Sequence, residues 1–291
     1  MNTMSLKESN DKIIELLQSN KPFYISRIGQ GAETMVSYTY IMSKNINHPA
    51  FKNLVPILHN NNGIYIDNNP NLLKIYCELY FKAVKESDYL AAFRNAVVKE
   101  QNLMKPNNKE LLYSRILEPF YCYEEDNIKP WSHYLINKKV LIISPFVDSF
   151  KKQINNNFQI YKDPDKKIFL DKQEFIYYKC FNNNGFNKSH KNWLETLNVM
   201  CEDIKKIDFD VALLGCGGYG MPLCYFIKNV LNKSSLYVGG GLQLLFGVMG
   251  KRWDNNDMWN KIIKENESKF IRPSGEEIIK NNNNIEDGCY W

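Results

Sequence analysis

The stretch of sequence from Phe209 to Trp253 reads FDVALLGCGGYGMPLCYFIKNVLNKSSLYVGGGLQLLFGVMGKRW and decides the fold. Val211–Leu214 is an apolar run that ends in a glycine-rich turn, and a helix-compatible apolar run follows. Leu236–Val238 is a second strand-like run, and it ends in a second glycine cluster, Gly239–Gly241. An open parallel sheet builds a ligand site in this way, from turns and helices at the carboxyl ends of its strands.

The same alternation of strands and helices runs through the rest of the chain. The expected strands are Phe23–Ile28, Ile64–Ile66, Tyr89–Phe93, Lys139–Ser144 and Phe175–Cys180. The expected helices are Ser5–Ser19, Gly31–Ser43, a helix opened by Asn69 and Pro70, Val147–Gln153, Trp193–Lys206 and Met258–Lys264. Leu111–Leu117 fits either a strand or a helical turn. The pattern predicts an α/β fold, with a mostly parallel, Rossmann-like sheet and helices on both faces.

The sequence shows no sign of a boundary between domains. No shift in composition indicates a linker and no internal repeat is present, so we expect one α/β domain over residues 1–291. The alternative is two halves, 1–137 and 138–270, followed by a polar C-terminal tail. Asparagine runs are predicted to be loop tips, because Asn tolerates turn conformations; these runs are Asn60–Asn62, Asn155–Asn157, Asn182–Asn184 and Asn281–Asn284.

The net charge, the apolar runs and the cysteine spacing indicate which kind of ligand and which compartment suit the protein. The net charge of +5 is dispersed along the chain, which favours a small anionic ligand over nucleic acid. No apolar run approaches the roughly 18 residues of a membrane span, and the polar start does not resemble a signal peptide, so we expect a cytoplasmic protein. The seven cysteines and four histidines show no zinc spacing, which predicts reduced thiols. Nothing in the sequence indicates an oligomeric state.

The segment Ser26–Glu33, SRIGQGAE, lies where the first expected strand turns into a helix. Gly29 and Gly31 permit a tight turn and a close approach of the backbone to a ligand. Arg27 can pair with a phosphate, and Glu33 can act as a general base or ligate a divalent metal. The alternative interpretation is an ordinary strand-to-helix loop with an ion pair between Arg27 and Glu33.

The first glycine cluster in the opening stretch is a candidate phosphate site. It contributes Gly217, Gly218, Tyr219 and Gly220. Its spacing is neither that of a dinucleotide-binding turn nor that of a P-loop. Tyr219 can stack on a base or sugar. Cys216 would be a nucleophile only with a nearby base, and no histidine is close in sequence.

The second glycine cluster is followed by polar, basic and aromatic residues. Gly239, Gly240 and Gly241 can form a nest for an anion, and Gln243 can bind a base or sugar hydroxyl. Lys251 and Arg252 can neutralise a phosphate; the alternative is a tight turn with a solvated basic helix end. After the strongest strand, Ser144 can bind a ligand or cap the next helix.

Two of these motifs carry a resemblance to a known family. RIGQGAE near the start and GCGGYG with VGGGLQLLFGVMGKRW near the end resemble segments of the GT-D type glycosyltransferases. The resemblance spans about residues 23–253 of this chain. It implies a Rossmann-like α/β enzyme that moves a sugar from a nucleotide-sugar donor to a glycan or other acceptor.

The resemblance also implies roles for particular residues. An Asp-x-Glu arrangement in that family holds Mn²⁺ or Mg²⁺ and the donor diphosphate, and Glu33 would be its carboxylate here. This chain departs from the pattern, because Gly31 stands two residues before Glu33. A metal-independent mechanism would instead use Arg27, Lys251 and Arg252 to stabilise the leaving diphosphate.

Two other functions stay open. One is a nucleotide-sugar-binding protein without catalysis, which the missing aspartate allows. The other is a nucleotide-processing hydrolase of the phosphoribohydrolase kind, whose glycine-rich strand ends resemble VGGG and GVMG. That hydrolase needs a P-G-G-x-G-T-x-x-E segment, which this chain lacks.

Overall fold

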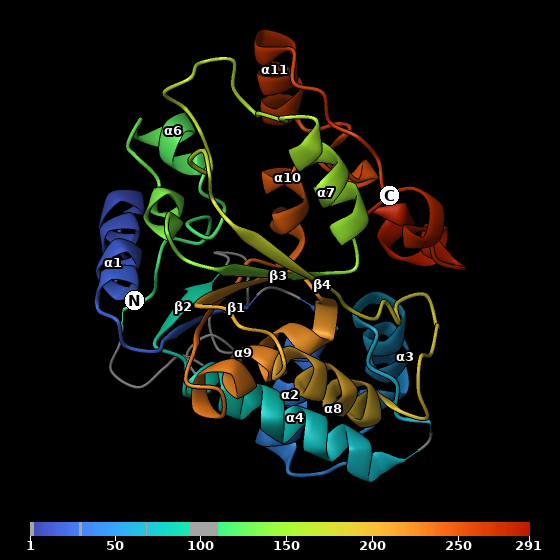
Figure 1. Ribbon diagram of the computed structural model, residues 1–291. Helices are drawn as coiled ribbons and strands as arrows, with labels where there is room; N and C mark the ends of the chain where they lie inside the picture. Colours follow the sequence, from blue (N-terminus) through green and yellow to red (C-terminus); the bar gives the residue numbers. More distant parts are fainter. Residues whose placement is uncertain (1–2, 29–30, 68, 93–109) are drawn as a thin grey trace.

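The fold is an α/β sandwich around one sheet of six parallel strands (Figure 1). The computed structural model describes residues 3–28, 31–67, 69–92 and 110–291. The strand order is β2-β1-β6-β5-β3-β4, and every pair of neighbours is parallel. The strands are β1 (Tyr24–Ile28), β2 (Tyr89–Ala92), β3 (Val140–Ser144), β4 (Phe175–Lys179), β5 (Val211–Leu214) and β6 (Ser234–Tyr237). The predicted fold class is therefore confirmed, and the described sheet is wholly parallel.

Helices cover both faces of this sheet. One face carries α2 (Ala32–Ser43), α3 (Phe51–Asn62), α4 (Pro70–Lys85), α8 (Trp193–Ile204) and α9 (Gly220–Asn229). The opposite face carries α1 (Leu6–Gln18), α6 (Tyr121–Glu125), α7 (Val147–Asn155), α10 (Leu242–Leu245) and α11 (Asp257–Asn266). Both layers are visible in Figure 1, below and above the sheet.

The alternation of side chains along each strand explains why there are two cores. In β3, Leu141 and Ile143 belong to the core under α2, α4, α8 and α9, whereas Val140 and Ile142 belong to the core under α1, α7 and α11. All five residues of β3 are buried. A central parallel strand is buried on both faces, so it needs this continuous apolar run.

Two helices begin at capping residues that the sequence indicates. Ser5 caps α1 and forms a capping box with Glu8. Asn69 caps α4, whose first residue is Pro70. Leu111 and Leu112, part of the segment that fitted two structures, form only isolated β-bridges before a turn.

Two local predictions were wrong. Ile64–Ile66 forms no strand, and the chain before it is helical, since α3 runs from Phe51 to Asn62. The run Asn60–Asn62 is therefore the end of a helix and not a loop tip. Gly63 closes this helix with a left-handed conformation, as a helix-terminating glycine commonly does.

The segment after α11 packs against the rest of the protein, although its sequence is polar. Ile285 is fully buried and Cys289 nearly so, and the side chain of Asn60 donates to the carbonyl of Asn284. The C-terminal segment thus lies beside α3 (Figure 1). The last residues return to the carboxyl edge of the sheet, where Tyr290 meets the pocket described below.

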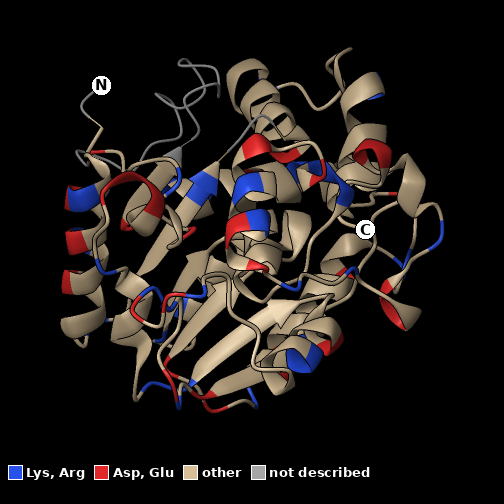
Figure 2. Ribbon diagram, turned by 90° about the horizontal axis from the view of Figure 1, so that it is seen from above, with Lys and Arg blue, Asp and Glu red and all other residues tan. Residues whose placement is uncertain are grey.

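Charge is spread over the molecule. Figure 2 shows Lys and Arg interleaved with Asp and Glu over the described part of the chain. Over the same residues, every helix is too short or too polar to cross a bilayer.

Candidate functional site

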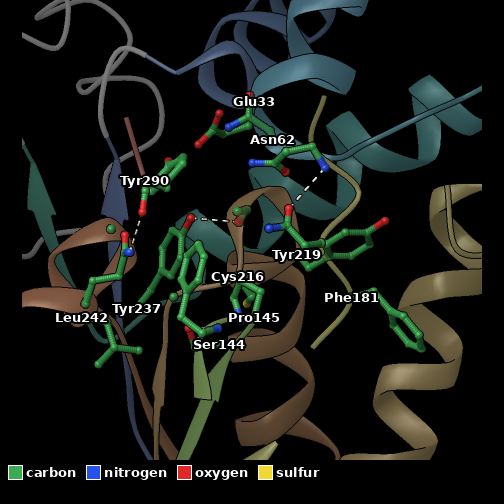
Figure 3. Close-up of a pocket in the computed structure, with 18 residues that line it drawn as sticks. Glu33, Asn62, Ser144, Pro145, Phe181, Cys216, Tyr219, Tyr237, Leu242 and Tyr290 are labelled. Carbon is green, nitrogen blue, oxygen red and sulfur yellow. Dashed lines mark hydrogen bonds between the residues drawn. The ribbon is translucent and has the colours of Figure 1, made fainter. Parts of the chain in front are cut away.

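A pocket opens at the carboxyl ends of the strands (Figure 3). The segments that follow β1, β3, β4, β5 and β6 all contribute to it, together with the end of α3 and the C-terminal segment. Its lining residues are Glu33, Asn62, Ser144, Pro145, Phe146, Phe181, Asn182, Asn184, Gly215, Cys216, Gly217, Tyr219, Tyr237, Gly239, Gly240, Leu242, Gln243 and Tyr290. Open parallel sheets bind ligands at this edge.

Two glycine turns form part of the wall. Gly217 and Gly239 follow β5 and β6 and have φ of +57° and +69°, a conformation that side chains other than glycine rarely adopt. Each turn begins a short 3-10 helix that leads into α9 or α10. The first N–H groups of a helix have no partner within it, so both turns offer donors that suit a phosphate.

Glu33 places a carboxyl group in this pocket from the first turn of α2. Its side chain folds back over Gly31, where an added Cβ would lie 2.4 Å from Oε2 of Glu33. Burial raises the pKa of Glu33 to about 7, although hydrogen bonds from its own backbone N–H and from Asn62 oppose the shift. A carboxyl with this pKa is present in both protonation states near neutral pH, as a general acid or base must be.

Tyr219 and Tyr237 brace the glycine turns. The hydroxyl of Tyr219 donates to the carbonyl of Gly63 at 3.0 Å, and that of Tyr237 donates to the carbonyl of Gly217 at 2.9 Å. Burial raises the pKa of both phenols. Tyr219 is 1% exposed, so it does not present a free face for stacking on a base or sugar.

The predicted phosphate-binding cations lie outside the lining. Arg27 pairs with Glu118 at 2.9 Å and also donates to the carbonyl of Val238. Because both side chains of this ion pair are at most 10% exposed, Arg27 anchors β1 to the segment around Glu118. Lys251 is exposed at the surface.

Arg252 lies at the rim of the pocket, beside Tyr290 and Gly240. Its guanidinium lies 4.2 Å from the centre of the Tyr290 ring and 3.2 Å from a carboxylate oxygen of Glu286. An added Cβ on Gly240 would lie 3.1 Å from Arg252. Arg252 thus lies beside Gly240 of the second glycine turn, whereas Arg27 lies beside Gly239, 3.8 Å from a Cβ added there.

The predicted site residues fall into three groups. Those that line the pocket are Glu33, Ser144, Gly217, Tyr219, Gly239, Gly240 and Gln243. Those packed directly behind or beside it are Arg27, Gly31, Gly218, Gly220, Gly241 and Arg252. Lys251 is apart from the pocket, and Gly29 lies outside the described residues.

Sequence reasoning missed the asparagines and Tyr290. Asn62 comes from the end of α3, and Asn182 and Asn184 come from the loop after β4. The second pair could have been found, because a polar run directly after a predicted parallel strand lies at the edge where ligands bind. No local signal identifies Tyr290, which reaches the pocket only through the path of the C-terminal segment.

The donor set does not fit a resident divalent cation. Among the described lining residues Glu33 is the only carboxylate, and no group of three His, Cys, Asp or Glu side chains gathers in residues 3–28, 31–67, 69–92 and 110–291. The amide oxygens of Asn62 and Gln243, which also line the pocket, carry no charge. Mg²⁺ and Mn²⁺ sites rely on ionised carboxylates.

Comparisons with protein-family models, with curated proteins and with solved structures find no significant match.

Proposed function

We propose that the protein is a glycosyltransferase that binds a nucleotide-sugar in this pocket and transfers the sugar to a hydroxyl-bearing acceptor. The observation that carries the proposal is the position of Glu33. A buried carboxyl group with a pKa near 7 lines the same pocket as two glycine turns that can bind phosphate. A base and a diphosphate site within one pocket are what glycosyl transfer requires.

The residues divide the chemistry between them. The backbone N–H groups at Gly217 and Gly239 would bind the diphosphate and stabilise the negative charge that it gains as its bond to the sugar breaks. Ionised Glu33 would take the proton of the acceptor hydroxyl while the new bond forms from that oxygen to the sugar. Arg252 at the rim would add positive charge near Gly240.

A second candidate is a nucleotide-sugar-binding protein without turnover. The observation that favours it is the single carboxylate in the described lining. Binding alone needs the glycine turns and the amide side chains, whereas transfer also needs Glu33 to be ionised and close to an acceptor.

The test is a thermal-shift screen of UDP- and GDP-sugars with and without Mn²⁺, followed by mass spectrometry of the products. We expect at least one nucleotide-sugar to stabilise the protein without metal, and to be consumed when acceptor sugars are added. Glu33→Gln should keep the binding of the nucleotide and lose about 100-fold or more of the turnover, the usual contribution of a general base.

Three outcomes would contradict the proposal. Stabilisation by no nucleotide-sugar would overturn it altogether. Binding without consumption would establish the non-catalytic candidate, and release of a free base from a nucleoside monophosphate would establish the hydrolase.

A further inference from the structure

The hydrogen-bond donors around the pocket are largely bonded to the protein itself. Four side chains at the pocket donate to main-chain carbonyls. The bonds run from Tyr219 to Gly63 at 3.0 Å, from Tyr237 to Gly217 at 2.9 Å, from Gln243 to Tyr290 at 3.0 Å and from Asn184 to Asn61 at 2.9 Å. These bonds fix the wall and leave those N–H and O–H groups turned away from a ligand.

The acceptors in the same pocket show the opposite pattern. Oε2 of Glu33, Oδ1 of Asn62 and Oε1 of Gln243 are buried and have no hydrogen-bond partner. Gln243 is only 2% exposed, and its amide is held by the bond from Nε2 to Tyr290, so its oxygen cannot turn toward solvent. Figure 3 shows Glu33 and Asn62 close together on the wall opposite Ser144 and Pro145.

Buried polar atoms are almost always partnered, so each exception needs a reason. Eight buried side-chain oxygens in the described residues lack a partner, and three of them line this one pocket. Leaving such an atom unpaired costs on the order of 1–3 kcal/mol. A ligand that brings donors would remove that cost at three places together.

We propose that the wall formed by Glu33, Asn62 and Gln243 binds a neutral, hydroxyl-rich group, a monosaccharide unit whose hydroxyls donate to these three oxygens. This inference rests on the proposed function and places the sugar of the donor within the pocket. Phosphate oxygens are acceptors, so they would face these oxygens without a hydrogen between them. The glycine turns are the complementary end, because they offer N–H groups.

A hydroxyl group suits this wall better than an ammonium group. A hydroxyl both donates and accepts, so it can donate to Oε1 of Gln243 and still accept from a protonated Glu33. An ammonium group only donates, and in a closed pocket it would need a fully ionised carboxylate beside it. Glu33 is the single carboxylate in the described lining.

The experiment measures how much the sugar adds to nucleotide binding. Dissociation constants for UDP, UDP-glucose, UDP-galactose, GDP and GDP-mannose are compared between the full-length protein and Gln243→Met. We expect at least one nucleotide-sugar to bind the wild type about tenfold more tightly than its nucleotide. Gln243→Met should weaken that nucleotide-sugar about fivefold to twentyfold, the loss expected for one hydrogen bond, and change the nucleotide less than about twofold.

Two further variants separate recognition from structure. Gln243→Glu keeps an acceptor oxygen, and its buried carboxyl in the protonated form still donates to the carbonyl of Tyr290, so it should retain most of the sugar-dependent affinity. Gln173→Leu removes another buried amide oxygen without a partner, far from this pocket, and should change neither affinity.

The outcomes distinguish this inference from the proposed function. An equal loss of nucleotide and nucleotide-sugar affinity in Gln243→Met, or no added affinity from any sugar, would overturn the inference. Stabilisation by Mn²⁺ or ethanolamine that Gln243→Met abolishes would also overturn it, in favour of a cation. If no nucleotide binds while methyl glucoside or methyl mannoside does so through Gln243, the proposed function fails and the sugar site stands.

Discussion

Glu33 is the residue on which both proposals depend, and its burial makes a prediction about stability. The pKa of its carboxyl rises from 4.5 to about 7 on folding, mainly because burial disfavours the ionised form. Between these two pH values the folded protein holds a proton that the unfolded chain has released. The free energy of unfolding should therefore fall as pH rises from about 4.5 to about 7 and stay lowered above that.

The variant Glu33→Gln has no such proton to lose. Its unfolding free energy relative to the wild type should increase between pH 5 and pH 8 by roughly 2–3 kcal/mol, because most of the rise in pKa from 4.5 to about 7 acts between these two pH values. Urea denaturation at the two pH values measures the difference. Glu202→Gln, at an exposed position on α8, is the control and should show no such increase. A flat difference for Glu33→Gln as well would mean that its carboxyl is solvated.

Single residues also show which features can be predicted from the sequence and which cannot. The glycines after β5 and β6 predicted the turns that the structure has, because positive φ favours that residue type. The partner of Arg27 could not be predicted, since Glu118 is 91 residues away and meets it only in the folded chain. An arginine at a strand end looks the same in sequence whether it faces a ligand or a buried carboxylate.

Among the elements, α7 depends on a capping residue from far along the chain. Glu277 accepts hydrogen bonds at 3.0 Å from the backbone N–H groups of Asp148 and Ser149, and a further one from the Ser149 hydroxyl. It is 3% exposed. Its carboxylate thus satisfies the open N–H groups of the helix and complements the helix dipole.

Glu277→Gln should lower the free energy of unfolding by about 1–3 kcal/mol, because an amide NH₂ would replace one of the oxygens that face these donors. The neighbouring Glu276→Gln is the matched control, since the Glu276 side chain is 94% exposed. Thermal and urea denaturation compare the two variants. Equal stabilities would show that α7 does not rely on this cap.

The helix α3 illustrates an element that local pattern did not reveal. It has no side-chain cap at its start, contains Pro56, and ends in three asparagines, all of which count against a helix. Phe51 and Leu58 bury themselves in the core beside α2, and this packing outweighs the poor local sequence. Asn62 is the last residue of α3 and depends on this helix for its position in the pocket. Because the sequence pattern does not indicate the helix, it does not indicate this lining residue either.

At the scale of the whole molecule, the location of the site was more predictable than its composition. Parallel strands bring the loops after them to one edge, so glycine clusters after two expected strands had to lie close together. Asn62 and Tyr290 come from a helix end and from the C-terminal segment, and their approach depends on long-range packing. The sequence pattern therefore predicts the location of the pocket but only some of the residues that line it.

The strand order also decides how the molecule should unfold. β1 and β2 belong to the part before residue 138, and β1 pairs directly with β6 from the part after it. Each core likewise draws side chains from both parts, with Val36 and Trp193 in one and Ile13 and Trp259 in the other. Neither part can complete its sheet or its cores alone.

We therefore expect one cooperative unfolding transition, since shared cores give no stable half-folded state. Far-UV circular dichroism and tryptophan fluorescence should give coincident urea curves, because buried tryptophans report from both cores. A fragment of residues 1–137 should show neither a sharp transition nor protected amides in hydrogen exchange. Two separated transitions, or a folded fragment, would show that the halves are domains in their own right and that the pocket is assembled at the boundary between them.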